Sequence, residues 1–221
     1  MAWWFGRSKT QEAKKEPPAA EDIVARVYAF LSDEERQNRK LPDWLREEIG
    51  RAPSVDQVPG GAGEFGRDPS NPVPANGPFG EAQYLSSLMT EAGQPVAFQR
   101  LGSLGRIDVF ETVTFDGLDW DVLYLTKYFP RKSRIAPKGF RFATKEERPA
   151  LIRGVVDQEE DFPFATFARV TKFTARVLGV SIADPRLQAF DTLKYRIPEG
   201  HVRELERLRF GVRAATEKEA G

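Results

Sequence analysis

The segment from Arg106 to Lys127 constrains the fold most, because it has the pattern of a β-hairpin. Its centre is Asp116-Gly117, a pair that suits the positive φ angles of a type I′ turn, and apolar residues alternate on both sides. A two-residue turn places one series of cross-strand pairs on a single face. The pairs are Phe115 with Leu118, Val113 with Trp120, Glu111 with Val122, Val109 with Tyr124, and Ile107 with Thr126. We predict that this face is core, and that the opposite face is solvated near the turn and dry near the open end.

The neighbouring segments extend this hairpin to an α+β domain. Residues 95–101 have the pattern of a third strand, and Gly102-Ser-Leu-Gly105 then turns the chain into the hairpin. Such a Gly-x-x-Gly spacing also occurs in phosphate-binding loops, but the strand-to-helix setting that those loops need is lacking here. We expect a twisted antiparallel sheet of three to five strands, packed by C-terminal helices near Phe167 and Leu205.

Apolar residues at three- and four-residue spacing predict the helices. The predicted helices cover residues 20–31, 42–49, 81–89, 144–156, 163–178 and 202–212, and a last strand covers 193–197. A further short helix is expected after Ser32, which forms a capping box with Glu35. The helix over 42–49 is expected to start at Pro42 or Asp43 and to end at Gly50 in the left-handed conformation.

Composition divides the chain into five segments. Residues 1–19 form an aromatic and basic leader, 20–50 a small helical unit, 81–215 the α+β core domain, and 216–221 a frayed tail. Between them, residues 51–80 hold six prolines and six glycines with few apolar residues, a composition that cannot build a core of its own. We call residues 51–80 the strap, and expect it to lie against the core domain.

Charge and cysteine content exclude several classes of function. The 33 basic and 33 acidic residues cancel, so any charge-driven binding must come from local clusters. The chain has no cysteine and one histidine, His201, which excludes disulfides, thiolate chemistry and sites with several histidines. No run approaches the roughly 18 apolar residues of a membrane-spanning helix. We expect a cytoplasmic protein without a cofactor or metal.

The most informative polar feature is the basic loop, residues Lys127 to Arg141, which has no acidic residue. Its cations are Lys127, Arg131, Lys132, Arg134, Lys138 and Arg141. Three interpretations are open: a sheet edge that Lys and Pro protect from strand addition, a docking site for an acidic protein, or a site for nucleic acid or another phosphate ligand.

Three carboxylates are the weak candidates for catalysis. Asp119 and Asp121 flank Trp120 on one strand, with Cα atoms about 7 Å apart by strand rise, and could bind a divalent cation or act on a glycoside. Two aspartates beside a turn are more often plain solubilising residues. Glu111 is expected among apolar neighbours, where burial would suit an acid or base, although a salt bridge to an arginine of a packed helix or a position at the rim of the sheet is the favoured explanation.

The aromatic residues near the N-terminus indicate binding to a partner. Trp3, Trp4 and Phe5 in the leader, and Trp44 in the helical unit, are suited to docking onto a protein, and the leader could also touch a membrane surface. The leading hypothesis is therefore a non-catalytic accessory or adaptor protein that docks through the leader and the basic loop. A nucleic-acid or phosphate-binding module is the second hypothesis, and a carboxylate-dependent hydrolase or metal enzyme is the third.

Overall fold

The computed structural model describes residues 29–30, 32–144, 146–147, 154–155, 162–163, 172, 181, 206–208 and 211. The leader, the tail, the strand expected over 193–197 and most of the helices expected over 20–31, 163–178 and 202–212 lie outside these residues. The described part is an α+β structure with a five-stranded sheet, in the order β1-β5-β4-β3-β7, and a two-stranded sheet of β2 and β6.

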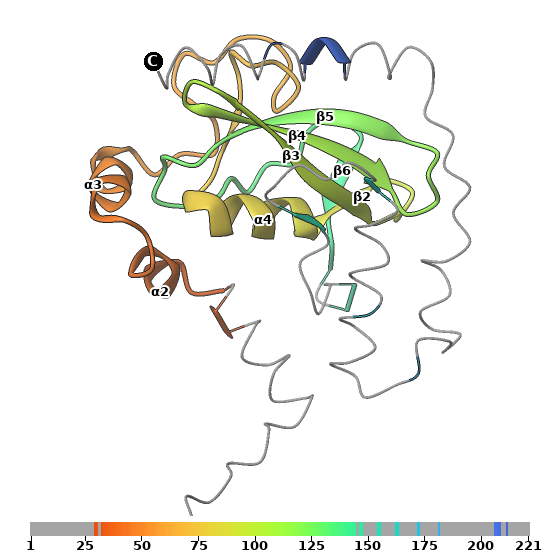
Figure 1. Cartoon of the computed structure of the whole chain (residues 1–221), viewed down its shortest axis with the longest axis horizontal. Coiled ribbons are helices and arrows are strands. Elements are labelled where there is room, and N and C mark those ends of the chain that lie inside the picture. Colours follow the sequence, from red (N-terminus) through yellow and green to blue (C-terminus); the bar gives the residue numbers. More distant parts are fainter. Residues whose placement is uncertain are drawn as a thin grey trace, which may run out of the picture.

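Three consecutive antiparallel strands form the centre of the larger sheet (Figure 1): β3 (Val96–Leu104), β4 (Ile107–Thr114) and β5 (Trp120–Thr126). The register between β4 and β5 pairs Val113 with Trp120 and Glu111 with Val122, as the alternating pattern predicts. The predicted pairing of Ile107 with Thr126 is absent from this ladder, whose last pair at the open end is Asp108 with Leu125.

The turn between β4 and β5 is longer than the predicted two-residue type I′ turn. Within the described residues only glycines have positive φ, and here that residue is Gly117, at +73°. The Gly117 N–H donates to the Thr114 carbonyl at 2.9 Å. Asp116 Oδ1 accepts from the Thr114 hydroxyl at 2.6 Å and from the Leu118 N–H at 3.1 Å. The aspartate closes the turn with its side chain, so it does not need the positive φ that a type I′ turn requires.

The turn predicted over Gly102 to Gly105 is also displaced. Gly102, Ser103 and Leu104 continue β3, and the register shifts between Arg100 and Gly102. This bulge absorbs one extra residue, so the chain reverses only at Gly105, whose φ is +59°.

The sheet is mixed rather than purely antiparallel, because both edge strands pair in parallel. At one edge β1 (Val73–Pro74), which belongs to the strap, pairs with the end of β5. At the other edge β7 (Gly154–Val155) pairs with Phe98 and Gln99 of β3. The prediction of a helix over 144–156 is therefore wrong at its C-terminal end, where long-range strand pairing overrides the local helical spacing.

Three helices with described bounds precede the central strands. The first is α2 (Glu34–Asn38), and Asp33 caps it by accepting from the Arg36 N–H at 2.9 Å, so the predicted cap at Ser32 is wrong by one residue. The second, α3 (Asp43–Arg51), starts as expected but does not end in a left-handed Gly50. Ala52 is extended instead, because the proline that follows it disfavours helical geometry.

Helix α4 (Gly77–Ser87) starts four residues before the predicted position. Gly77 has φ +63°, and Pro78 occupies the first turn, where its missing N–H costs nothing. The chain leaves α4 directly into β2 (Leu88–Thr90), which pairs with β6 (Phe140–Phe142) at the end of the basic loop. None of the helices among the described residues has the length and apolar character needed to cross a membrane.

The main core lies between the sheet and α4, which runs along one sheet face (Figure 1). Its buried members are Val73, Ala82, Tyr84, Leu85, Leu88, Val96, Phe98, Phe110, Leu123 and Leu125. This is the face that we predicted to be solvated near the turn. The predicted core face is buried too, in smaller clusters around Val113 and Val109. The hairpin pattern could not predict which face of the sheet carries the larger core, because the elements that cover each face come from elsewhere in the chain.

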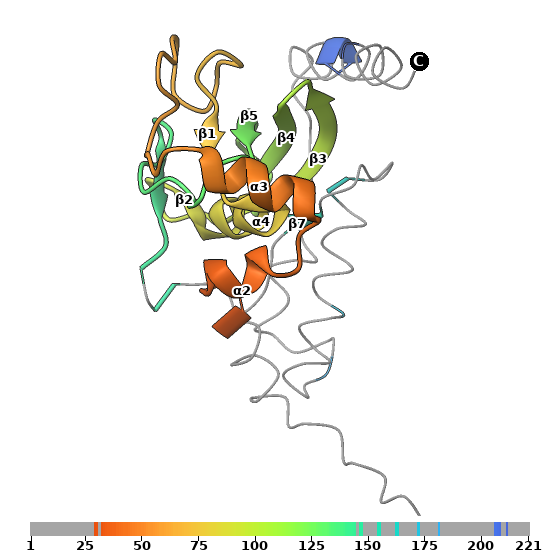
Figure 2. The ribbon, with the colours of Figure 1, turned by 90° about the vertical axis from the view of Figure 1, so that its left-hand side faces the viewer.

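Helix α3 packs beside α4 (Figure 2). Its buried residues Leu45 and Ile49, together with Leu41, contact Phe79 of α4 and Tyr128 of the basic loop. These contacts fix one side of α3 to the body of the protein.

Candidate functional site

One aspartate of the strap, Asp56, binds two arginines of the basic loop. Asp56 Oδ1 accepts from Arg131 Nη1 at 2.5 Å, and Asp56 Oδ2 accepts from Arg134 Nη2 at 2.8 Å. The Arg134 backbone N–H also donates to Asp56 Oδ1, at 2.9 Å. The hydrogen bonds from Arg131 and Arg134 hold the pKa of Asp56 far below its ordinary range, so the carboxylate stays ionised.

Three other cations of the basic loop also have partners within the chain. Lys132 Nζ donates to Gln83 of α4 at 3.0 Å, and Arg141 forms an ion pair with Glu147 at 2.7 Å. Lys127 reaches the buried side of the sheet, as described below. Lys138 is exposed, and no ion pair involves it within the described part of the chain. The structure therefore brings five of the six predicted cations onto polar groups of the same chain.

The least expected feature is a buried pair of carboxyl groups between α4 and β4. Glu81 of α4 is 1 % exposed and Asp108 of β4 is 2 % exposed. Burial, followed by the negative charge of Asp108, raises the pKa of Glu81 well above its ordinary value and favours its protonated form, and the Glu81 carboxyl is hydrogen-bonded to Asp108. Glu81 Oε1 has no hydrogen-bond partner among the described residues.

Two cations hold Asp108 in its ionised form. Lys127 Nζ donates to Asp108 Oδ2 at 2.7 Å, and Arg100 donates to Oδ1 through Nη2 at 2.7 Å and Nε at 3.0 Å. Burial by itself would raise the pKa of Asp108. The hydrogen bonds from Lys127 and Ser103 and the positive charge of Arg100 together lower the pKa by more than burial raises it, so the net shift is downward. Because both carboxyl groups are enclosed, no dissolved substrate reaches them, and the arrangement is suited to structure rather than catalysis.

Glu81 was not predicted as a site residue, although a signal for its burial exists. It lies three residues before Tyr84 and four before Leu85, on the stripe of α4 that faces the core. An acidic residue on such a stripe predicts a buried partner, but the spacing alone does not tell which residue that partner is.

Glu111 lies on the other face of the same strand and is 1 % exposed. The predicted register of Glu111 opposite Val122 is confirmed, and the structure decides the open question of its burial. Gln99 Nε2 of β3 donates to Glu111 Oε2 at 2.7 Å, across the register that pairs the two residues. The two residues cross-link adjacent strands, and neither is accessible from solvent.

Asp119 and Asp121 border an open cavity of about 330 Å³ near the hairpin turn. Asp121 Oδ2 accepts from Arg67 of the strap, through Nη2 at 2.5 Å and Nε at 2.8 Å. Asp121 is therefore committed to an ion pair. Among the described residues no group of three or more acidic or histidine side chains could hold a metal ion.

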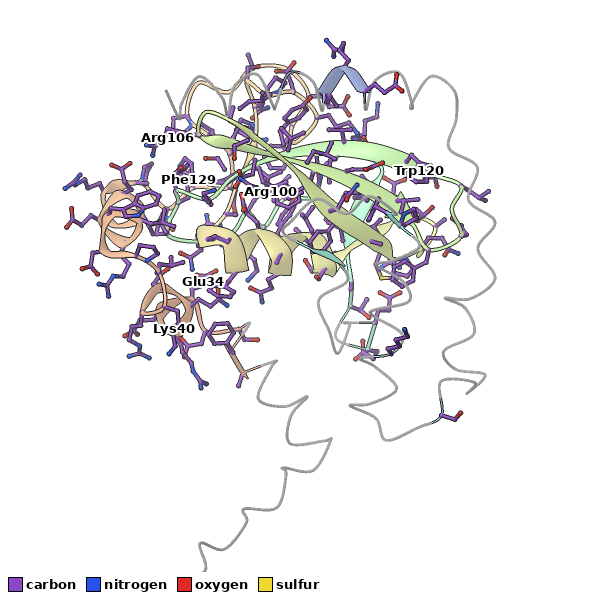
Figure 3. The ribbon with its side chains drawn as sticks, viewed as in Figure 1. Glu34, Lys40, Arg100, Arg106, Trp120 and Phe129 are labelled. Carbon is purple, nitrogen blue, oxygen red and sulfur yellow. The ribbon has the colours of Figure 1, made fainter. Side chains whose placement is uncertain are left out.

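Trp44 is the predicted partner-binding residue that the structure describes, since Trp3, Trp4 and Phe5 lie outside the described residues. Its side chain projects from α3 and is 57 % exposed, whereas Leu45 beside it is 3 % exposed. Figure 3 shows Arg106 and Phe129 at the end of the molecule near α3, and Trp120 at the opposite end of the sheet.

No known protein indicates a function for this chain: no family model, curated protein or solved structure matches it.

Proposed function

We propose that the protein is a non-catalytic accessory protein that docks onto a partner protein through exposed aromatic residues, with Trp44 as the central contact. The observation that carries the proposal is the exposed indole, 57 % accessible on a helix whose other side is buried. Tryptophan is the residue type most enriched at binding hot spots, because its large ring gains much from desolvation in a partner's pocket.

The packing of α3 against the rest of the protein favours binding at Trp44, because a helix that is already fixed loses little conformational entropy when a partner binds. Leu45 and Ile49 attach α3 to the core. Glu48 of α3 also accepts from Arg106 Nη2 at 2.8 Å, and the Arg106 guanidinium lies over the Tyr128 ring at 4.0 Å. A partner therefore meets a preformed surface and need not order it first.

The charges around Trp44 favour a partner with an apolar pocket. Asp43 pairs with Arg46, Glu47 pairs with Arg51 at 3.3 Å, and Glu48 pairs with Arg106 at 2.8 Å, so each acidic residue of the helix has a cationic partner. A surface without excess charge gives little electrostatic attraction, and binding should depend weakly on salt. The leader residues Trp3, Trp4 and Phe5 would add a second contact, which rests on the sequence alone.

The basic loop contributes less to this proposal than to the sequence-based hypothesis. Its cations, Lys138 excepted, contact polar groups of the same chain, so an acidic partner or a nucleic acid would compete with Asp56, Asp108 and Glu147. The nucleic-acid hypothesis stays a prediction, and so does the enzyme hypothesis, in which Asp121 would have to exchange its bond to Arg67 for a substrate or metal.

A photo-crosslinking experiment tests the docking proposal. A photoreactive phenylalanine analogue replaces Trp44 in one variant and Leu118 in a matched control, because Leu118 is 76 % exposed at the far end of the sheet. After irradiation in the native host, the crosslinked proteins are identified by mass spectrometry. We expect one protein that crosslinks at position 44 and not at position 118.

The affinity of the identified protein then provides the quantitative test. Purified Trp44→Ala should bind it more weakly by about 2 kcal/mol, the usual loss at a hot spot, whereas Leu118→Ala should bind like the wild type. Both variants should melt at the wild-type temperature, since both side chains are exposed. Equal affinities of the two variants, or identical crosslinks at both positions, would refute the proposal.

A further inference from the structure

The open cavity near the hairpin turn lies at the opposite end of the sheet from α3, and the docking proposal does not use it (Figure 3). Its volume of about 330 Å³ is at the lower end of the range for small-molecule sites. The strap contributes Arg67, the sheet contributes Val96 and Thr112, and the start of β6 contributes Phe140. Part of the wall is therefore apolar, and a short aliphatic group could lie against it.

The main hydrogen-bond donors of this cavity already have acceptors in the protein. Arg67 uses Nε and Nη2 on Asp121, and its Nη1 donates to Glu64 at 3.0 Å and to the Lys138 carbonyl at 2.6 Å. The Arg67 guanidinium also lies over the Phe140 ring, at 5.3 Å. An anionic ligand would have to break these bonds, so the arginine does not make an anion site.

The threonine hydroxyls on the sheet side are engaged in the same way. The Thr112 hydroxyl donates to the Asp121 carbonyl at 3.3 Å, and the Thr114 hydroxyl donates to Asp116 Oδ1 at 2.6 Å. Both threonines are 1 % exposed, which fixes them in these bonds.

The acceptors, in contrast, are available. Glu91 and Asp119 line the cavity with exposed side chains, and in the described part of the chain no ion pair involves either carboxylate. Among the described residues that line the cavity, these two and Asp121 make three carboxylates against one guanidinium, that of Arg67, so this part of the lining has a net charge of minus two. A ligand that fits must bring both positive charge and N–H donors.

We propose that this cavity binds an alkyl-ammonium or alkyl-guanidinium group. The cationic head lies between Glu91 and Asp119, and its aliphatic stem lies against Val96 and the edge of Phe140. The group could belong to a free amine or to a lysine or arginine side chain of a peptide, because the two present the same chemistry to the cavity.

Titration of the full chain with agmatine, followed by ¹H–¹⁵N NMR, tests the assignment. Agmatine carries both cationic groups on a four-carbon stem, and we expect saturable shifts at the amides of Glu91, Asp119 and their neighbours. Butanol serves as the uncharged ligand and glutarate as the anionic one, and neither should shift these amides. N-acetyl-arginine amide forms the second arm, because tighter binding of this compound than of agmatine would identify the ligand as a peptide side chain.

Matched variants keep the proposal falsifiable. The double variant Glu91→Gln with Asp119→Asn should weaken agmatine binding by about tenfold or more, as the loss of charge-assisted bonds predicts. The control Glu47→Gln removes an exposed carboxylate of α3 and should leave the affinity unchanged. If the double variant loses its dispersed amide spectrum, the single variants are titrated instead. Agmatine binding that equals butanol binding, or that is as strong in the double variant as in the wild type, would overturn the proposal.

Discussion

Two aspartates in this protein each hold two cations, but in different surroundings. Asp108 binds Arg100 and Lys127 inside the protein, and its side chain is 3 % exposed. Asp56 binds Arg131 and Arg134 at the surface, where its side chain is 23 % exposed. Both have a lowered pKa, so both pairings favour the ionised carboxylate.

The comparison separates the effect of burial from that of hydrogen bonding. At Asp108 burial works against ionisation, and bonds from Lys127, Ser103 and Arg100 must overcome it. At Asp56 the hydrogen bonds from Arg131 and Arg134 have the largest effect on the pKa, and water still reaches the carboxylate and the Arg134 side chain, which are 23 % and 76 % exposed. The same pairing therefore stabilises the core in one place and fastens the strap to the basic loop in the other.

The largest expected effect is that of Asp108→Ala. It leaves Arg100 and Lys127, whose side chains are 29 % and 18 % exposed, without their carboxylate partner, and breaking such a largely buried cluster costs about 3 kcal/mol. Urea denaturation measures the loss in the free energy of unfolding. Asp43→Ala is the control, because Asp43 is 84 % exposed in its ion pair, and this variant should lose at most about 0.5 kcal/mol. Similar losses in the free energy of unfolding of the two variants would show that the buried ion pairs of Asp108 are no more stabilising than an exposed pair.

The second prediction concerns Glu81→Gln. Because burial raises the pKa of Glu81 above its ordinary 4.5, the folded protein keeps a proton that the unfolded chain releases. The stability linked to this proton is fully present below pH 4.5 and is lost as the pH rises through the raised pKa. The variant does not titrate, so its melting temperature should exceed that of the wild type by a margin that grows with pH over this window.

The Asp108→Asn background provides the control for this prediction. There an ionised Glu81 could replace the lost negative charge beside Lys127, so adding Glu81→Gln should destabilise the protein instead of stabilising it. A melting temperature that shows the same pH dependence in wild type and Glu81→Gln would mean that Glu81 is not the titrating group.

The third prediction concerns Asp56→Ala, which should cost about 1 kcal/mol, less than the loss at Asp108, because Asp56 itself is partly solvated and water can solvate the released Arg134, which is 76 % exposed. The variant should also elute from a heparin column at higher salt than the wild type, since Arg131 and Arg134 become available to anions. Asp68→Ala, which changes a neighbouring acid of the strap, should leave the elution unchanged. Unchanged elution of Asp56→Ala would show that the two arginines are not masked in the wild type.

The smallest effect on stability is expected at Glu147. The hydrogen bond from Arg141, followed by that from the Thr144 N–H, lowers the pKa of Glu147 from 4.5 to about 2. Its contribution to stability is present above pH 4.5 and is lost as the pH falls toward about 2. An NMR titration should show this midpoint in the wild type and a higher one in Arg141→Ala. Arg46→Ala, which changes α3, should not move it.

Local features of the sequence were sufficient to predict the strands at the centre of the sheet and their register. The alternation around Asp116-Gly117 predicted that Val113 pairs with Trp120, because side chains alternate faces along a strand and a short turn sets the register. Proline likewise predicted the start of α3. The turn type was wrong, since the side chain of Asp116 satisfies the turn in a way that the backbone preference does not reveal.

The candidate sites were harder to predict, because their partners are far apart in the sequence. Asp56 and Arg131 are separated by 75 residues, and Arg67 and Asp121 by 54. The basic loop was visible as a run of like charges, but the residues that its cations contact, in the strap and elsewhere, were not. Glu81 was missed for the same reason, since its partner Asp108 lies on a strand that the helix meets only in the folded protein.

The sequence by itself determined the three central strands, the start of α3 and the presence of a concentrated basic loop. Only the tertiary structure decided which face of the sheet carries the larger core, that both edge strands pair in parallel, and which carboxylates the cations contact. The physical reason is the range of the interactions. Side-chain alternation and turn geometry act over a few residues, whereas burial and ion pairing depend on elements that the fold brings together from distant parts of the chain.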